Sequence, residues 1–226
     1  MLRSGTGMEV GEARRWDYGA EGAAFSVGWH QWWTVGRHRL FCGSLAVLDE
    51  VDATLFYTDP PWNNQILRVF ERDCGAAHID GGWEAVYGHI ARLAAGRPAF
   101  TEGGKQNATR AASVLGADCL IVRSWPITYG RGQRECLLHY CGPPFSEIML
   151  PFPGPLGMDD RDTPGWALSC FEPGTVADLC AGRGVTALAA EKAGWASVSV
   201  ELDPRRASAL LSRLAKATGC HPKRLH

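Results

Sequence analysis

The chain has 226 residues, of which 46% are hydrophobic and 21% charged, a balance typical of a globular protein with one substantial core. Its 23 lysine and arginine residues against 24 aspartate and glutamate residues give a net charge of −1, which excludes a protein-wide positive field for capturing nucleic acid. Any polyanionic ligand would therefore have to bind a local patch of basic side chains.

The sequence indicates neither a membrane span nor a framework of metals or disulfides. No apolar run approaches the roughly 18 residues that a membrane span needs, and residues 1–16 lack the hydrophobic segment of a signal peptide. The eight cysteines form no CxxC pair, so we expect reduced thiols and no metal site. These features predict a cytoplasmic protein without a membrane partner.

Short apolar runs alternate with amphipathic segments along most of the chain. Residues 1–31 are rich in glycine and alanine without a clear period and predict an irregular N-terminal arm, whereas residues 32–226 are expected to form a single catalytic domain. Strands are predicted at 38–42, 53–58 and 98–101, and helices at 83–95 and 107–115. Two apolar runs, 119–123 and 135–140, flank a glycine-containing turn at 129–132 and predict a hairpin.

The second half of the chain continues this alternation after a loop. Six prolines in 141–164 predict an extended segment, and Asp162-Thr163-Pro164 is a typical helix start. A strand at 175–179, a helix at 184–194, a strand at 196–201 and a helix at 204–218 follow. The pattern predicts an α/β domain with a mostly parallel sheet and a terminal antiparallel hairpin.

A glycine-rich turn follows the predicted strand at 175–179. The run DLCAGRG at 178–184 joins this strand to the next helix, and such a turn lets the backbone approach a ligand at the carboxyl end of the sheet. Glu201 ends the next strand about twenty residues later and is placed to accept hydrogen bonds from a ribose diol. The absence of GxGxxG and of a following lysine argues against a dinucleotide or a Walker-type phosphate site.

A second motif, DPPW at 59–62, directly follows the predicted buried strand at 53–58. The two prolines supply carbonyl acceptors and no donors, so they hold the backbone after Asp59 in a fixed form. A carboxylate, a carbonyl and an aromatic ring together suit a planar base with an exocyclic amine. We expect Asp59 and the Pro60 carbonyl to accept from the amine and Trp62 to stack on the base.

DPPW at 59–62, DLCAGRG at 178–184 and the stretch from Trp33 to Ser44 together resemble the S-adenosylmethionine-dependent amino-methyltransferases that act on adenine N6 or cytosine N4. The resemblance covers residues 32–218. Its catalytic motif precedes its cofactor motif, the permuted order of the β group, which includes many bacterial and phage DNA adenine methyltransferases. It implies a Rossmann-like class I methyltransferase fold, permuted, with a mostly parallel seven-stranded sheet that ends in an antiparallel hairpin.

The resemblance also implies the site residues. The catalytic group would be Asp59, Pro60, Pro61 and Trp62. The residues implied to bind S-adenosyl-L-methionine are Cys42, Gly43, Ser44, Thr58, Asp178, Cys180, Ala181, Gly182, Gly184, Glu201 and Asp203. Among them, the glycine motif would contact the methionine end, Glu201 the ribose, and residues 42–44 the adenine. Because a sulfonium is already an activated methyl donor, no metal is expected.

Recognition of nucleic acid is less clearly specified by the sequence. The segment 141–162, where a recognition region is expected, is short. This predicts that the protein recognises a short or relaxed DNA sequence, or that a partner or second protomer recognises the sequence for it. A base that leaves the duplex would regain stacking in the site. The candidate contacts to nucleic acid are Asn63, Asn64, Lys105, Arg110, Arg131 and Arg134.

The leading prediction is transfer of a methyl group to N6 of adenine in DNA, because tetrapeptides that begin with Asp are commoner among adenine enzymes. Three alternatives stay open: a cytosine-N4 DNA methyltransferase, an RNA adenosine-N6 methyltransferase, and a catalytically silent nucleic-acid-binding subunit.

Overall fold

The computed structural model describes residues 19–76, 79–116, 121–132, 134–142 and 154–225. Its strands are β1 (Gln31–Val35), β2 (His38–Cys42), β3 (Leu55–Thr58), β4 (Ala99–Gly104), β5 (Ile121–Tyr129), β6 (Arg134–Cys141), β7 (Thr175–Asp178), β8 (Ala196–Glu201) and β9 (Lys223–Leu225). Its helices are α2 (Gly19–Gly22), α3 (Asn64–Cys74), α4 (Gly82–Ala94), α5 (Ala108–Leu115), α6 (Thr163–Ser169), α7 (Val185–Lys192) and α8 (Pro204–Thr218), with short 3-10 turns η2 (Leu45–Val47) and η3 (Lys105–Asn107).

Within these residues, nine strands form one sheet in the order β5-β6-β4-β3-β7-β8-β2-β1-β9. The five central strands, from β4 to β2, are parallel to one another. The β5–β6 hairpin continues the sheet antiparallel from β4, and β1 and β9 continue it antiparallel from β2. The predicted α/β class and hairpin are confirmed, but the predicted seven-stranded, mostly parallel sheet is wrong, because a second antiparallel edge is present.

The second edge escapes sequence analysis for a physical reason. All three residues of β9 are exposed, and two of them, Lys223 and Arg224, are charged. The strand joins β1 through backbone pairing, with Trp33 opposite Arg224. A short charged strand of this kind protects a sheet edge from further pairing, and it carries no alternating apolar signal.

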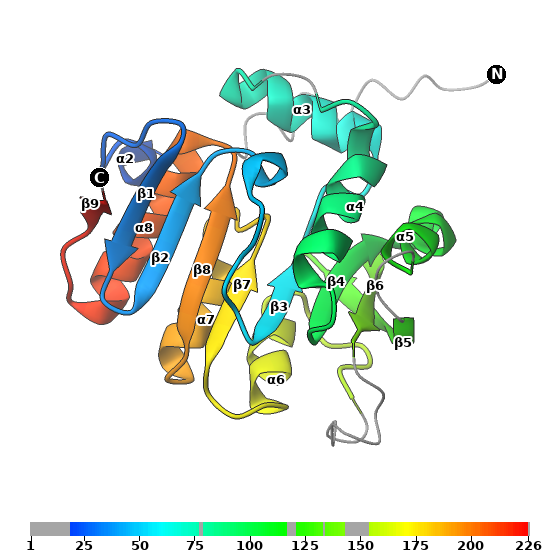
Figure 1. Cartoon of the computed structure of the whole chain (residues 1–226). Helices are drawn as coiled ribbons and strands as arrows, with labels where there is room; N and C mark the ends of the chain where they lie inside the picture. The colour runs from blue at the N-terminus through cyan, green and yellow to red at the C-terminus, as the bar shows by residue number, and fades with distance from the viewer. Residues whose placement is uncertain (1–18, 77–78, 117–120, 133, 143–153, 226) are drawn as a thin grey trace.

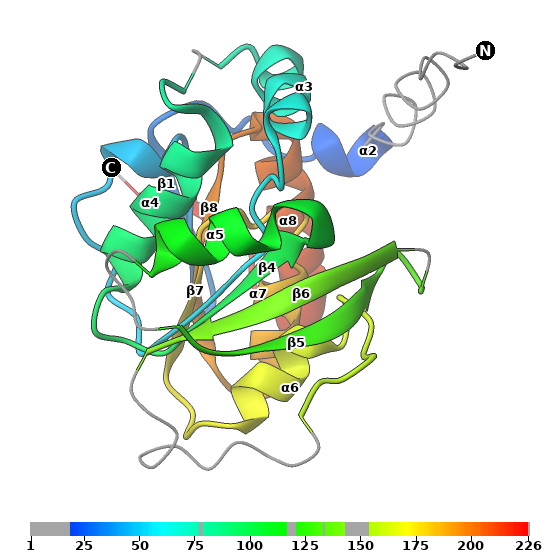
Figure 2. The same ribbon diagram turned by 90° about the vertical axis from the view of Figure 1, so that its right-hand side faces the viewer.

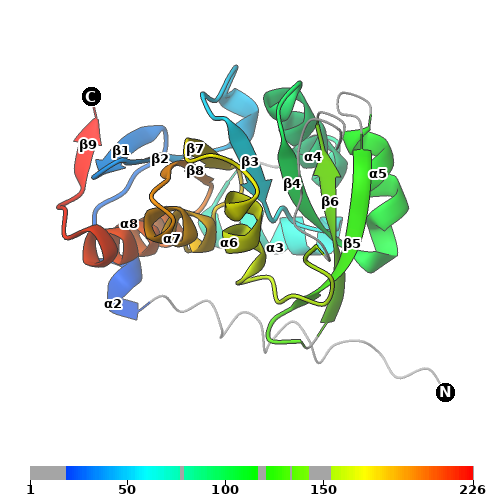
Figure 3. The same ribbon diagram turned by 90° about the horizontal axis from the view of Figure 1, so that it is seen from below.

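Helices cover both faces of the sheet. Helices α6, α7 and α8 lie on one face, and α4 and α5 lie on the other (Figures 1 and 3). Helix α3 lies beyond the carboxyl ends of the central strands (Figure 1). Figure 2 shows the β5–β6 hairpin at its own edge of the sheet, between α5 and α6. The molecule is therefore a three-layer α/β/α domain, with α3 above the edge where parallel strands end.

The central strand β3 is buried along its whole length, as both covered faces require. Phe56 packs in the core beneath α4, while Leu55 and Tyr57 pack in the core beneath α6 and α7, which is the alternation of a strand. The strand ends at Thr58, directly before Asp59-Pro60-Pro61. The burial of β3 on both sides fixes the position from which the DPPW motif starts.

Helix α3 is an element that the sequence analysis did not predict. The Asn63 side chain accepts a hydrogen bond from the Ile66 N–H at 2.9 Å and so caps its start, and Gly75 ends it in the left-handed conformation. Both signals are readable from the sequence. Helix α3 follows Trp62 by one residue and therefore sits beside the catalytic motif.

The segment before β1 is partly placed by α8. Residues 1–18 of the predicted irregular arm lie outside the described residues, and β1 begins at Gln31. The Ser208 hydroxyl of α8 donates to the Glu21 carbonyl and accepts from the Phe25 N–H, both at 3.0 Å. Phe25 packs edge-to-face against Trp33, so the described part of the arm is docked on α8.

Candidate functional site

A cavity of about 960 Å³ opens at the carboxyl ends of the parallel strands. All five parallel strands contribute to its lining, through Gly43 after β2, Asp59 after β3, Glu102 in β4, Asp178 in β7 and Glu201 in β8. Open α/β sheets bind ligands at this edge. The two sequence motifs therefore meet in one cavity.

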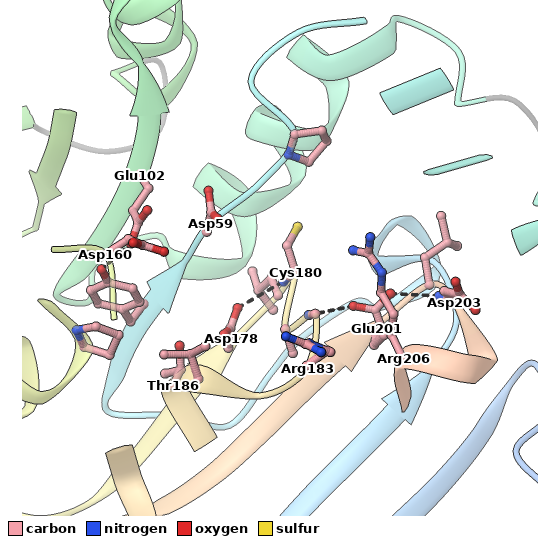
Figure 4. Close-up of a pocket in the computed structure, with 18 of the residues that line it drawn as sticks. Asp59, Glu102, Asp160, Asp178, Cys180, Arg183, Thr186, Glu201, Asp203 and Arg206 are labelled. Carbon is pink, nitrogen blue, oxygen red and sulfur yellow. Dashed lines mark hydrogen bonds between the residues drawn. The ribbon is translucent and has the colours of Figure 1, made fainter. Parts of the chain in front are cut away.

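Figure 4 shows how the cavity is divided. Asp59 lies in the middle. Glu102 and Asp160 lie on one side of it, and Cys180, Asp178 and Glu201 lie on the other. We call the first side the acid lobe, lined by Tyr57, Glu102, Tyr129 and Asp160, and the second the glycine-turn lobe, lined by Asp178, Cys180, Ala181, Gly182, Glu201 and Asp203.

The glycine turn is tied to the end of β8 by the Glu201 carboxylate. Its Oε2 accepts from the Gly182 N–H at 2.6 Å, and its Oε1 accepts from the Asp203 N–H at 2.8 Å. Gly182 has a φ of 53°, and no atom lies within 4 Å of the place where a Cβ would stand. The turn therefore presents bare backbone to open space beside a fixed carboxylate.

Burial perturbs the acids of the glycine-turn lobe. Burial away from water raises the pKa of Glu201 to about 7, although Arg206 and the two backbone donors oppose the rise. Burial also raises the pKa of Asp178 to about 6, and its Oδ1 accepts from the Cys180 N–H at 3.2 Å. Perturbed acids gathered in one cavity are typical of functional sites.

An arginine and an aromatic side chain meet at the wall of the cavity. The Arg206 guanidinium of α8 lies 4.4 Å from the ring centre of Phe70 on α3, and both line the cavity. This cation–π contact joins α3 to α8 at the cavity.

Asp59 is held by the last residue of its own motif. The Trp62 indole Nε1 donates to Asp59 Oδ1 at 2.9 Å. The Trp62 ring packs edge-to-face against Tyr129, and its carbonyl accepts from the Asn107 side chain at 2.9 Å. Burial, with Asp160 and Asp178 nearby, raises the pKa of Asp59 well above its ordinary value.

Many of the predicted site residues line the cavity. These are Gly43, Ser44, Asp59, Pro61, Arg131, Asp178, Cys180, Ala181, Gly182, Glu201 and Asp203. The others are not among the lining residues, namely Cys42, Thr58, Pro60, Trp62, Asn63, Asn64, Lys105, Arg110, Arg134 and Gly184. Among this second group, Gly184 is needed for packing, because a Cβ there would stand 2.7 Å from Leu210 Cγ.

Several predicted nucleic-acid contacts have partners within the fold. Lys105 pairs with Glu135 at 2.5 Å, and Arg110 pairs with Glu84 at 2.7 Å. The Asn63 amide oxygen caps α3, and the Asn64 amide oxygen accepts from the Trp83 N–H at 2.9 Å. Arg131, by contrast, is exposed and lines the cavity.

Three lining residues of the acid lobe were missed by sequence analysis. Glu102 directly follows the predicted strand at 98–101, and a carboxylate at the end of a strand next to β3 is a signal that could have found it. Tyr129 fell within the predicted turn and Asp160 within the predicted loop. Asp160 approaches the cavity because its N–H donates to the Thr128 carbonyl at 2.8 Å, a tertiary contact without a local signal.

The part of the chain that the structure describes contains no group of three or more His, Cys, Asp or Glu side chains placed to hold a metal ion. Its helices also include none long and apolar enough to cross a membrane. Seven cysteines are described, and each carries a free thiol.

No family model and no curated protein matches the chain. Solved structures do match it. M1.HpyAVI has a TM-score of 0.55 at 14% identity, covering 78% of this chain and 98% of that one. TTHA0409 of Thermus thermophilus, a proposed DNA modification methylase solved with S-adenosyl-L-methionine, has a TM-score of 0.58 at 18% identity, covering 80% and 94%.

The PvuII DNA methyltransferase, which is cytosine-N4-specific, has a TM-score of 0.51 at 12% identity and covers 82% of this chain and 93% of that one. The chain shares the fold of these proteins. At these identities the similarity establishes the fold, and the chemistry of this chain has to be argued from its own site.

Proposed function

We propose that the protein transfers a methyl group from S-adenosyl-L-methionine to the exocyclic N6 amine of adenine in DNA. The observation that carries this proposal is the shared cavity: Asp59 of the DPPW motif and the Gly182–Glu201 pair open on the same space. A methyl donor and an amine acceptor must meet in one such space. M1.HpyAVI and TTHA0409, which share the fold, have both been solved with the same cofactor.

The glycine-turn lobe fits this cofactor. A Cβ at Gly182 would occupy open space, so the backbone there can lie directly against a ligand. A carboxylate has about four lone-pair sites, and two on Glu201 are taken by backbone N–H groups, which leaves acceptors for the two hydroxyls of a ribose. Asp178, Cys180 and Ala181 would hold the methionine end, and Gly43, Ser44 and Asp203 the adenine and ribose side.

When bound, S-adenosyl-L-methionine supplies an electrophilic methyl group on its sulfonium. In the proposed mechanism, Asp59, which lines the cavity, accepts a hydrogen bond from the amine of the target base. The Pro60 carbonyl, next to it in the chain, is the expected second acceptor, although Pro60 does not line the cavity in this structure. Because Asp59 Oδ1 already accepts from Trp62, we assign the amine to its Oδ2. These two acceptors hold the nitrogen lone pair toward the methyl group, and the rate gain comes from orientation and electrostatics.

The stacking surface for the base is assigned here to Tyr129. Its ring lines the cavity beside Asp59, whereas Trp62 packs against Tyr129 and holds Asp59. The base must leave the duplex to reach this lobe, and stacking on an aromatic ring offsets about 1 to 3 kcal/mol of the lost stacking.

Cytosine N4 is the second candidate target, since the cytosine-N4-specific PvuII enzyme shares the fold. Both bases present an exocyclic amine, so Asp59 alone does not separate them. Nucleoside mass spectrometry of DNA from cells that express the protein distinguishes the two. We expect N6-methyladenine, and N4-methylcytosine without N6-methyladenine would overturn the adenine assignment.

We further propose that recognition is short or relaxed, or is supplied by a partner or a second copy. The expected recognition segment, 141–162, offers little chain for reading bases, and residues 143–153 of it lie outside the described residues. Mapping of methylated positions across a genome tests this. Six or more specified base pairs read by the isolated monomer would contradict it.

A further inference from the structure

Glu102 of the acid lobe belongs neither to the glycine turn nor to the DPPW motif, and the proposed mechanism does not use its carboxyl group. Glu102 is 1% exposed and lines the cavity. The Tyr57 hydroxyl donates to its Oε1 at 2.5 Å, and Thr163 Oγ1 lies 2.5 Å from the same hydroxyl oxygen. Its Oε2 has no hydrogen-bond partner among the described residues. A buried polar atom without a hydrogen-bond partner destabilises the fold, so it calls for an explanation.

The surroundings of Glu102 are acidic. Several elements bring titratable or charged groups to it or to its lobe. Strand β3 and its end supply Tyr57 and Asp59, α4 supplies Tyr87, β5 supplies Tyr129, and β6 supplies Cys136 and His139. The segment that leads into α6 supplies Asp160, Arg161 and Asp162, and β7 supplies Asp178. Burial and then the nearby Asp59 carboxyl raise the pKa of Glu102 well above its ordinary value. Burial and the charge of Asp59 therefore both favour the un-ionised form of the Glu102 carboxyl.

The position of its proton follows from the hydrogen bonds. Because Oε1 accepts from Tyr57, the acid proton belongs on Oε2. The cavity thus presents two carboxyl groups with different roles: Asp59 as an acceptor and Glu102 as a donor. Two acids in one cavity whose environments perturb their pKa values can take different roles, one as acceptor and one as donor.

An acceptor beside a donor matches one part of a nucleobase. Adenine carries the N6 amine next to the unprotonated ring nitrogen N1, and cytosine carries the N4 amine next to the unprotonated N3. A base taken out of the duplex is read through hydrogen bonds to this Watson–Crick edge. Guanine and thymine carry a proton on the corresponding ring nitrogen. That N–H is a donor, so it could not accept a hydrogen bond from the Glu102 proton.

We propose that Glu102 is a specificity-determining residue that donates a hydrogen bond from its un-ionised carboxyl to the ring nitrogen beside the target amine. This inference rests on the proposed function and deepens it, since it names how the acid lobe selects adenine or cytosine over guanine and thymine. Tyr57 is then a positioning residue, because its hydroxyl orients the Glu102 carboxyl.

The test removes the ring nitrogen from the substrate. DNA carrying 1-deazaadenine, or 3-deazacytosine for a cytosine enzyme, keeps the exocyclic amine and replaces the ring nitrogen with C–H. Wild-type protein should lose about tenfold or more in kcat/KM on the deaza substrate, as expected for a lost buried hydrogen bond. Glu102→Ala should be slow on both substrates and show almost no further penalty on the deaza one.

Glu102→Gln is the matched variant, because a carboxamide can accept from Tyr57 and donate from its nitrogen. It should keep most of the activity and the deaza penalty, and it should stay active at alkaline pH values where the wild type declines. Thermal unfolding and cofactor binding of both variants, compared with wild type, show whether the fold is intact.

Equal deaza penalties in wild type and Glu102→Ala would overturn the inference while leaving the proposed function standing. Loss of transfer by Glu102→Gln, with fold and cofactor binding intact, would likewise overturn it. Absence of transfer by the wild type to any DNA would overturn the proposed function itself, and the inference with it.

Discussion

The indole N–H of Trp62 donates to the carboxyl group of Asp59 at 2.9 Å, so the first and last residues of the DPPW motif are joined to each other. This contact places Trp62 behind the carboxyl, packed on Tyr129, instead of on the cavity wall. It also takes one of the acceptor sites of Asp59 Oδ1. The motif is therefore a rigid acceptor whose aromatic member acts through the acid.

Replacing Asp59 by Ala should reduce methyl transfer by about a hundredfold or more, since the amine loses its main acceptor. Cofactor binding, measured by calorimetry, should change little, because Gly182 and Glu201 form the other lobe. Trp62→Phe serves as a graded control: it keeps the ring and removes the N–H that holds Asp59, so transfer should fall less. A loss of cofactor binding in Asp59→Ala would show that the two lobes are not separate in function.

Two glycines of one turn should fail in different ways when changed to Val. At Gly182 an added side chain meets open cavity, so Gly182→Val should weaken cofactor binding, with a backbone strain of about 1 to 3 kcal/mol. At Gly184 it meets Leu210 in the core, so Gly184→Val should mainly lower the free energy of unfolding. Calorimetry and urea unfolding separate these effects, and identical profiles for the two variants would argue against a ligand surface at Gly182.

The buried carboxyl of Asp178 should make stability depend on pH. Its pKa in the folded protein, about 6, lies above the ordinary value of 3.8, so the folded state holds a proton that the unfolded state releases. Its contribution is most favourable below pH 3.8 and is lost as pH rises through about 6. At about 1.4 kcal/mol per pKa unit, the change is on the order of 3 kcal/mol.

Asp178→Asn keeps the acceptor for the Cys180 N–H and removes the titration. Urea unfolding without cofactor between about pH 4 and pH 8 should show a flatter decline for the variant than for wild type. Parallel declines would mean that Asp178 is ionised across this range.

Among the basic residues predicted to contact nucleic acid, Arg131 should contribute most to DNA binding. It is exposed and lines the cavity, whereas Lys105 already pairs with Glu135. Arg131→Ala should weaken DNA binding. It should also reduce, by about 1, the magnitude of the slope of log association constant against log salt concentration. Lys105→Ala is the matched control and should change the slope less. A larger effect from Lys105→Ala would show that its ion pair opens when DNA binds.

Sequence reasoning located the parts of the site that depend on local chemistry. Asp59, Gly182 and Glu201 stand at strand ends, and an apolar run followed by proline or glycine marks a strand end from the sequence alone. Their meeting in one cavity follows from the rule that parallel strands share a carboxyl edge.

The acid lobe could not be predicted in the same way. Asp160 reaches it through backbone pairing with Thr128, and Tyr129 reaches it because the hairpin folds back beside β4. Both contacts join segments without a shared local pattern. Likewise, β9 is recognisable only once β1 offers it an open edge.

The proposed reaction is tested most directly by transfer of label from methyl-labelled S-adenosyl-L-methionine to DNA by the purified protein, with digestion and nucleoside mass spectrometry. We expect label in N6-methyladenine for the wild type and about a hundredfold less for Asp59→Ala. Absence of label from every DNA nucleoside, under conditions in which the protein is folded and binds the cofactor, would contradict it.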